Sequence, residues 1–150
     1  MVSVHDIAAY ILQRHGPISA AKLQKLVYYA QAWSLVWDDR PLFPEKIEAW
    51  ANGPIVLELY ERHKSLFSVD CWPYGDPGAL DANARETVDA ILDYYGPHNV
   101  QWLSDLIHAE EPWRLAREGL RDGERGEREI ALEAMMDYYS NLPIEAALVA

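Results

Sequence analysis

Apolar side chains recur every three or four residues between residues 18 and 37. That spacing aligns them in one stripe along a helix of about five turns, which Ser19 can cap at its N-terminus. The stripe consists of Leu23, Leu26, Val27, Ala30, Trp33, Ser34 and Trp37. Three polar side chains are left for other faces: Lys22, Lys25 and Gln31. Two tyrosines flank the stripe, so we expect a central core helix over residues 19–37 that other elements cover on several sides.

The same periodicity, bounded by capping and helix-breaking residues, predicts further helices on both sides. They are expected over residues 4–15, 55–64, 82–95, 100–107, 112–120 and 129–139. Asn52-Gly53-Pro54 should form a turn in which Pro54 opens the following helix, and residues 47–50 could be extended. Residues 65–78 and 121–128 are expected to form loops. The prediction is a mainly α protein: a single compact helical domain over residues 1–150, with 140–150 as a C-terminal tail and one short β pair as an option near residues 47–51.

Composition indicates a folded chain that is rich in large aromatic rings. The chain has 150 residues, enough to bury a core unaided, and half of them are hydrophobic, which argues against disorder. It holds 6 Trp and 9 Tyr but only 2 Phe. Trp and Tyr side chains fill cores, and they also anchor protein interfaces. Both roles stay open for any single ring.

The net charge narrows the range of partners. With 13 basic and 24 acidic residues, the formal charge is −11. An acidic surface repels phosphate groups, which argues against direct binding to nucleic acid or to anionic membranes. The charge favours a protein partner, and a partner with a basic surface fits it best. The first two predicted helices, joined by Gly16-Pro17, superficially suggest a helix-turn-helix, but the second is too apolar to read a DNA groove.

Several features bear on the cellular compartment. A single cysteine, Cys71, excludes an intrachain disulfide and fits a reducing compartment. The first residues lack the basic and apolar segments of a signal peptide, and the charge-free run from Leu26 to Trp37 is too short to span a bilayer. We therefore expect a soluble, cytoplasmic protein with no membrane partner.

The candidate chemical residues do not form a catalytic set. His108 and Glu110 have the H-x-E spacing of zinc deaminases, but that signature also needs a pair of cysteines. No two of the five histidines have the helical spacing of metal ligands. Cys71 stands beside Asp70, whose negative charge disfavours a thiolate nucleophile. A metal- or cysteine-dependent enzyme is the weakest alternative, and we expect no enzymatic activity, no cofactor and no metal.

A series of arginines follows the last histidine. Its members fall at steps of three or four, so they could line one face of a continued helix: Arg114, Arg117, Arg121, Arg125 and Arg128. Acidic residues are interleaved with them, and the local charge nearly cancels. The favoured interpretation is therefore a solvated face whose charges pair with one another.

An ordered set of short motifs carries a resemblance to a known family. The motifs are KLQKLVYYAQAW at 22–33, RPLF at 40–43, IEAW at 47–50, GPIV at 53–56 with Leu59-Tyr60, and LIHAEEPW at 106–113 with Ala116-Arg117. This series resembles the Panacea domain, the family that contains the SocA-like antitoxins and phage-associated proteins of bacteria. The resemblance extends from about Ile7 to Tyr139, and the chain departs from it at Leu57, where many members have proline.

The resemblance implies an antitoxin of a bacterial or phage toxin–antitoxin system. Such a protein is not an enzyme, and it neutralises a cognate toxin, encoded next to it, by direct binding. An alternative role is a proteolytic adaptor that delivers the toxin to a ClpXP-type protease through its ClpX-type unfoldase. The candidate interface residues are the motif positions least needed for a core: Trp50, Asn52, Gly53, Pro54, Tyr60, His108, Glu111, Trp113 and Arg117. The competing interpretation is that these motifs specify the fold.

The last residues, EAALVA at 145–150, resemble C-terminal tags that ClpX-type unfoldases read. If exposed, this segment would make the protein short-lived. The alternatives are that it packs on the core or becomes ordered on a partner.

Overall fold

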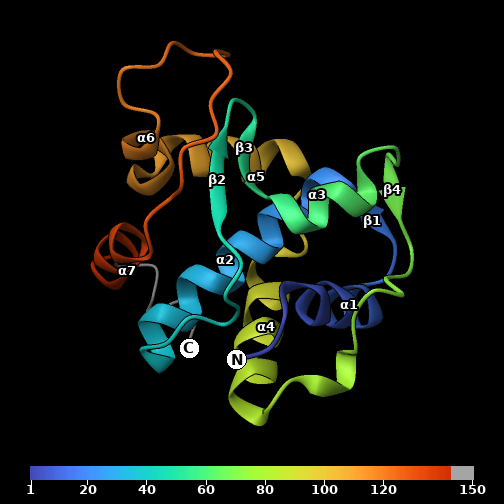
Figure 1. Cartoon of the computed structure of the whole chain (residues 1–150). Coiled ribbons are helices and arrows are strands. Elements are labelled where there is room, and N and C mark those ends of the chain that lie inside the picture. Colours follow the sequence, from blue (N-terminus) through green and yellow to red (C-terminus); the bar gives the residue numbers. More distant parts are fainter. Residues whose placement is uncertain (143–150) are drawn as a thin grey trace.

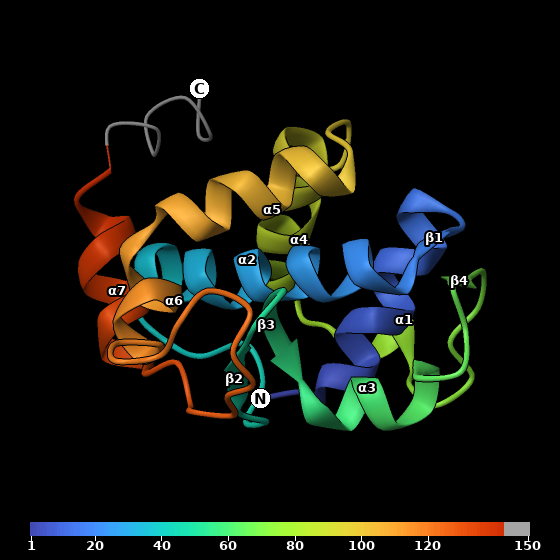
Figure 2. The same ribbon diagram turned by 90° about the horizontal axis from the view of Figure 1, so that it is seen from above.

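Helix α2 (Ala20–Asp38) runs through the centre of the computed structural model, which describes residues 1–142, and the other elements surround it (Figures 1 and 2). Its N-terminus is capped as predicted, because the Ser19 hydroxyl accepts a hydrogen bond from the Lys22 amide at 3.1 Å. The helix ends before Asp39, which adopts a left-handed conformation with a φ of 53°. Every residue from 23 to 35 is buried, so this part of the helix is covered around its full circumference.

Four helices cover α2 from different sides. They are α1 (Val4–His15), α4 (Ala82–Tyr95), α5 (Val100–Ala109) and α7 (Leu132–Ser140). Figure 2 shows α1 near the N-terminal half of α2 and α7 near its C-terminal half. The helices α1, α4 and α5 begin where the sequence predicts, because Ser3, Asp81 and Asn99 each accept a hydrogen bond from a backbone amide of the first turn.

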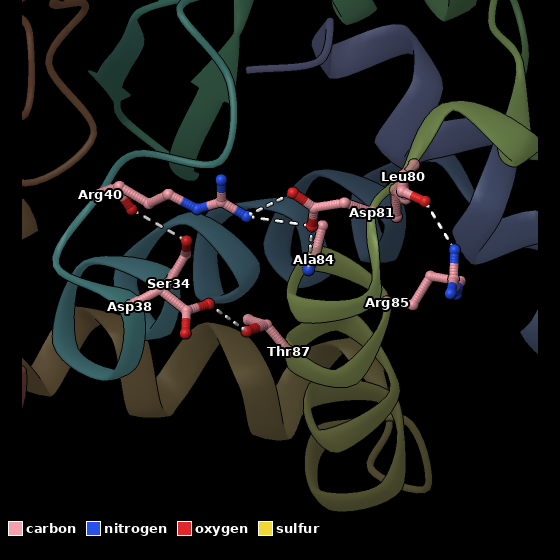
Figure 3. A network of polar contacts seen from close by, with 8 residues as sticks. All are labelled: Ser34, Asp38, Arg40, Leu80, Asp81, Ala84, Arg85 and Thr87. Atoms are coloured by element: carbon pink, nitrogen blue, oxygen red, sulfur yellow. Dashed lines mark hydrogen bonds and ion pairs between the residues drawn. The ribbon is translucent and has the colours of Figure 1, made fainter.

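A polar network joins the end of α2 to the start of α4 (Figure 3). Arg40 donates through Nη2 to both carboxylate oxygens of Asp81, at 3.0 and 2.9 Å. The Thr87 hydroxyl donates to Asp38 at 3.2 Å. Hydrogen bonds from the Ala84 amide and from Arg40 hold the pKa of Asp81 below its usual range, so this N-cap is charged at neutral pH.

A β hairpin replaces the start of the helix predicted over residues 55–64. Strands β2 (Ile47–Trp50) and β3 (Gly53–Val56) pair antiparallel, with Trp50 opposite Gly53, which confirms a short β pair at this place. Helix α3 (Leu57–His63) follows, so Pro54 lies in a strand and the predicted helix start was wrong. Proline fits an extended backbone as well as a helix start. The strand is favoured because Gln24 of α2 bonds both the amide and the carbonyl of Val56, at 2.9 and 3.2 Å.

An extended segment also lies along the other edge of β2. The Ala49 amide donates to the Arg128 carbonyl at 2.7 Å, and the Ile130 amide donates to the Ile47 carbonyl at 2.8 Å. Because these residues are held in an extended conformation, α7 begins at Leu132 and not at the predicted residue 129. Helix α6 (Glu111–Ala116) also ends before residue 120, since the chain turns at Gly119 with a φ of 87°.

The expected surface loop over residues 65–78 is fixed to the rest of the molecule at two points. Strand β4 (Ser68–Val69) pairs with β1 (Ile18–Ser19), and the turn η1 (Pro77–Ala79) packs against α1. Between them Trp72 is buried, and its indole donates to Nδ1 of His5 at 3.2 Å. These contacts join the segment to α1.

The fold class is mainly α, as predicted, with two small antiparallel strand pairs among residues 1–142. The largest fully buried side chains include Trp33, Tyr28, Tyr29, Tyr95 and Tyr139, so these rings belong to the core. Within the described part of the chain, no helix is both long enough and apolar enough to cross a membrane. The segment compared above with a degradation tag, 145–150, lies outside the described residues.

Candidate functional site

Most of the predicted interface residues meet around the β2–β3 hairpin. These residues, the hairpin cluster, are Trp50, Gly53, Pro54, Tyr60, His108, Trp113 and Arg117. The hairpin itself supplies the first three, while α3 supplies Tyr60 and the α5–α6 corner supplies the others. The motifs that the sequence shows far apart are therefore brought together by the packing of α5 and α6 against the hairpin.

Trp50 and Tyr60 form the partly exposed side of the cluster. Their rings meet edge to face with 4.8 Å between centroids. The Trp50 indole donates to Glu48 on the same strand at 2.8 Å, which fixes the direction of the ring. Both residues are half-buried, so part of each side chain remains accessible to solvent. This is the arrangement of a rigid aromatic contact.

Trp113 holds α6 against the hairpin. Its indole donates to the Trp50 carbonyl at 2.9 Å, and the residue is 8% exposed. The His108 ring stacks on it at 4.2 Å with an angle of 8° between the planes. Nε2 of His108 is buried and has no hydrogen-bond partner among residues 1–142. Trp113 is therefore mainly a packing residue, which supports the fold interpretation for this position.

Arg117 corrects the prediction of a solvated arginine face. The side chain is only 6% exposed, and it donates to the Ala49 carbonyl on β2 at 3.1 Å. Its other terminal nitrogen donates to the carbonyls of Arg121 and Glu124 in the following loop. The guanidinium also lies 5.4 Å from the centre of the Trp113 ring. Arg117 thus joins the loop, α6 and the hairpin, whereas Arg125 does pair on the surface, with Glu127 at 3.3 Å.

Asn52 and Glu111 are the exposed members of the predicted set. Asn52 stands in the hairpin turn, next to Gly53, whose φ is 137°. Glu111 begins α6 and faces a separate groove of about 440 Å³ between α6 and α7. That groove is lined by Ala109, Glu111, Arg114, Leu115, Glu118 and Tyr138. Glu111 therefore belongs to a different surface from the turn.

Two polar residues of α2 support the hairpin and were not singled out from the sequence. Besides bonding Val56, the Gln24 amide donates to Nε2 of His63 at 2.9 Å. Burial lowers the pKa of His63, which is consistent with a neutral ring that accepts this hydrogen bond. Lys25 is also buried and lies beneath Gly53. A pattern of apolar positions reports neither residue, because both stand outside the apolar stripe of the helix.

A buried carboxyl group lies where α5 meets α6. Glu110 accepts hydrogen bonds from the hydroxyls of Tyr29 and Tyr139, at 2.7 and 2.8 Å. Burial raises its pKa, and the two hydroxyls act in the opposite direction. Glu110 therefore contacts two tyrosine hydroxyls, whereas the nearby His108 stacks on Trp113, so the two side chains do not share a binding partner. Among residues 1–142, no three His, Cys, Asp or Glu side chains gather as metal ligands do.

The hairpin cluster consists of aromatic rings, the His108 imidazole, two residues of β3 and the buried Arg117 guanidinium, which contact one another and the backbone of β2. The fold and the cluster together define a small, mainly α domain whose motif residues assemble around a hairpin. The chain belongs to the family described as antitoxin SocA-like, Panacea domain, whose model matches residues 23–114. Membership supports an antitoxin-type role with a toxin as the partner. No curated protein and no solved structure gives a significant match.

Proposed function

We propose that this protein neutralises a cognate toxin by binding it directly, and that the exposed side of the hairpin cluster is the contact surface. The proposal places both proteins in the bacterial cytoplasm, with the toxin encoded next to this protein. It assigns no catalytic residue and no cofactor. Family membership is the observation that carries it.

The geometry of the cluster supports the choice of surface. Residues that dominate binding energies are commonly Trp, Tyr and Arg side chains held rigidly in well-packed surroundings. Trp50 and Tyr60 meet this description, because each is half-buried and Trp113 fixes the backbone beneath Trp50 through a hydrogen bond. Rings that are already fixed lose little rotamer entropy on binding. The net charge of −11 further favours a basic toxin surface.

Co-expression in a bacterium tests the proposal. The neighbouring reading frame is expressed alone and together with this protein, and growth, toxin level and co-purification are recorded. We expect arrested growth with the neighbour alone, and rescue with both proteins co-purifying at an unchanged toxin level. A harmless neighbour, or rescue without any complex, would contradict neutralisation by binding.

Matched aromatic variants locate the contact surface. Trp50→Ala should weaken the purified complex by about 30-fold or more, as truncation of a central interface aromatic does. Phe67→Ala serves as the control, because Phe67 is 88% exposed and lies in the loop before β4, outside the cluster. We expect it to change the dissociation constant by less than about threefold. The opposite ranking would move the interface to that loop.

The alternative role, an adaptor for a ClpXP-type protease, shares the binding step and differs in its consequence. An adaptor lowers the toxin level when the two proteins are co-expressed, and the level recovers when the protease is deleted. Direct neutralisation leaves the toxin level the same in both strains. Immunoblots of the toxin with and without the protease therefore separate the two roles.

A further inference from the structure

The groove of about 440 Å³ between α6 and α7 lies on a different face of α6 from the hairpin cluster. These two helices are neighbours at one end of the molecule (Figure 1). The α6 side of the groove is formed by positions 111, 114, 115 and 118, which recur at steps of three and four and therefore share one face. Trp113 and Arg117, which hold the hairpin, stand outside this set. A volume of this size lies within the range of sites that take a ligand group.

The α7 side of the groove is formed by Tyr138, whose position is supported by the core. Tyr138 is half-buried, and its ring meets that of Tyr139 edge to face with 5.1 Å between centroids. Tyr139 is fully buried and donates a hydrogen bond to Glu110 at 2.8 Å, and its hydroxyl lies 2.9 Å from that of Tyr28. A groove whose side is fixed in this way loses little rotamer entropy when it is filled.

The groove also contains an exposed apolar group. Leu115 is 49% exposed, and the exposed Ala109 lines the same groove. A single exposed leucine is common on protein surfaces and indicates nothing alone. Here it shares a concave site with the Tyr138 ring, so an apolar side chain that entered would remove both from water.

The charges of the groove complement a basic group. Glu111 and Glu118 stand at the two ends of the α6 side, with Arg114 between them. None of the ion pairs within residues 1–142 includes any of these three residues. Burial raises the pKa of Tyr138, and the charges of Glu110 and Glu111 raise it further, whereas Arg114 lowers it. The phenol is therefore protonated at neutral pH, and the carboxylate of Glu111 lies close enough to act on it.

Arginine matches this combination of groups better than lysine does. Its planar guanidinium can donate two parallel hydrogen bonds to one carboxylate, and it can stack on an aromatic ring. Glu111 supplies a carboxylate, and Tyr138 supplies a ring on the facing side of the groove. The overall charge of −11 attracts basic protein surfaces and repels polyanions such as nucleic acid.

We propose that the groove between α6 and α7 binds a segment of the toxin in which an arginine stands beside an apolar residue. The arginine pairs with Glu111 next to the Tyr138 ring, and the apolar side chain covers Leu115. This inference rests on the proposed function. It adds a second contact to the one at the hairpin cluster and names the residue types that the toxin presents there.

Two substitutions with matched controls test the groove. The dissociation constant of each purified variant with the neighbouring gene product is measured by calorimetry. Glu111→Lys should weaken the complex by about tenfold or more at low salt, and by less as the ionic strength rises. Its control, Glu86→Lys, makes the same change of charge at an exposed position on α4, outside the groove. The control should stay within about twofold.

The apolar contact is tested in the same way. Leu115→Ser should weaken the complex by about fivefold or more, because it removes an apolar contact. Leu66→Ser is the control, since Leu66 is 52% exposed and lies in the loop before β4. It should stay within about twofold. Both leucines are well exposed, so both variants should melt close to the wild-type temperature.

A double-mutant cycle identifies the arginine. Each arginine of the toxin is replaced by methionine, and the one that pairs with Glu111 should show a non-additive loss with Glu111→Gln. Additive losses for every arginine would overturn the pairing. The chain's own residues 143–150 are the other possible occupant, and a loss of binding from Leu148→Ser that is non-additive with Leu115→Ser would assign the groove to them and overturn the proposal.

The outcomes separate this inference from the proposed function. If Glu111→Lys and Leu115→Ser bind as their controls do while Trp50→Ala still weakens the complex, the groove is not a contact and neutralisation by binding stands. If the wild-type protein does not bind the neighbouring gene product, the proposed function fails, and the contact proposed here fails with it.

Discussion

Replacing Arg117 with Met should loosen the connection between the hairpin and the loop after α6. The substitution removes a guanidinium that bonds the carbonyls of Ala49, Arg121 and Glu124, and it keeps an unbranched apolar stem of similar length. Arg121 and Glu124 are exposed, so water can replace the lost donor at their carbonyls. The Ala49 residue is fully buried on β2, and its carbonyl loses a charged donor that water replaces poorly.

The magnitude follows from these surroundings. A hydrogen bond from a charged group to a buried acceptor contributes about 1.5–3 kcal/mol. The contact of the guanidinium with the Trp113 ring adds about 0.5–1 kcal/mol. We therefore expect Arg117→Met to lower the free energy of unfolding by about 2–4 kcal/mol. At about 2–4 °C per kcal/mol for a chain of this size, the melting temperature should fall by roughly 4–16 °C.

Urea denaturation of the purified protein, followed by tryptophan fluorescence, measures this change. Arg125→Met is the control, because it removes the same charge from the same loop at a side chain that is 90% exposed. Its effect should stay within about 0.5 kcal/mol. Hydrogen exchange should show faster exchange in residues 117–130 of Arg117→Met only. Equal stabilities for the two variants would refute the view that Arg117 is a structural connection.

Three further predictions concern buried polar groups and the turn. Gln24→Leu leaves the amide and the carbonyl of Val56 unpaired and should lower the free energy of unfolding, measured by urea denaturation, by about 1–3 kcal/mol. The control Gln13→Leu, at an exposed position, should leave the free energy of unfolding nearly unchanged. Equal effects of the two substitutions would contradict the role of Gln24. In Gly53→Ala, the alanine must adopt a φ of 137°, which should lower the free energy of unfolding by about 1–3 kcal/mol. An unchanged melting curve would show instead that the turn relaxes to another conformation. Burial raises the pKa of Glu110, so as pH rises the unfolded chain loses the proton of this carboxyl before the native state does. The protonated carboxyl therefore stabilises the native state at low pH, and this stabilisation is lost as pH rises from the ordinary range of a carboxyl through the raised pKa. The stability of Glu110→Gln minus that of the wild type, measured by denaturation, should therefore be larger near pH 7.5 than near pH 4. The same difference at both pH values would contradict this prediction.

The helices that begin at local capping residues could be predicted from the sequence, because a cap acts over three or four residues. Ser3, Ser19, Asp81 and Asn99 each begin a helix as expected. A short β pair near residues 47–51 was predicted as an option, but its second strand, β3, could not be predicted, since Pro54 is compatible with both a strand and a helix start. The side chain of Gln24, which is 32 positions from Val56 in the sequence, helps to decide between them. Residues 128–130 are extended for a similar reason, because they pair with β2.

For the candidate site, the sequence by itself determined which residue types recur in the motifs, how they are spaced and that the chain is acidic. Only the tertiary structure decided which of them face solvent. Arg117 and Lys25 seemed to belong to polar faces, yet both are buried, because the hairpin covers the side of α2 and of α6 on which they stand. Burial depends on what packs over a helix face, and the periodicity of one segment holds no record of the segment that will cover it.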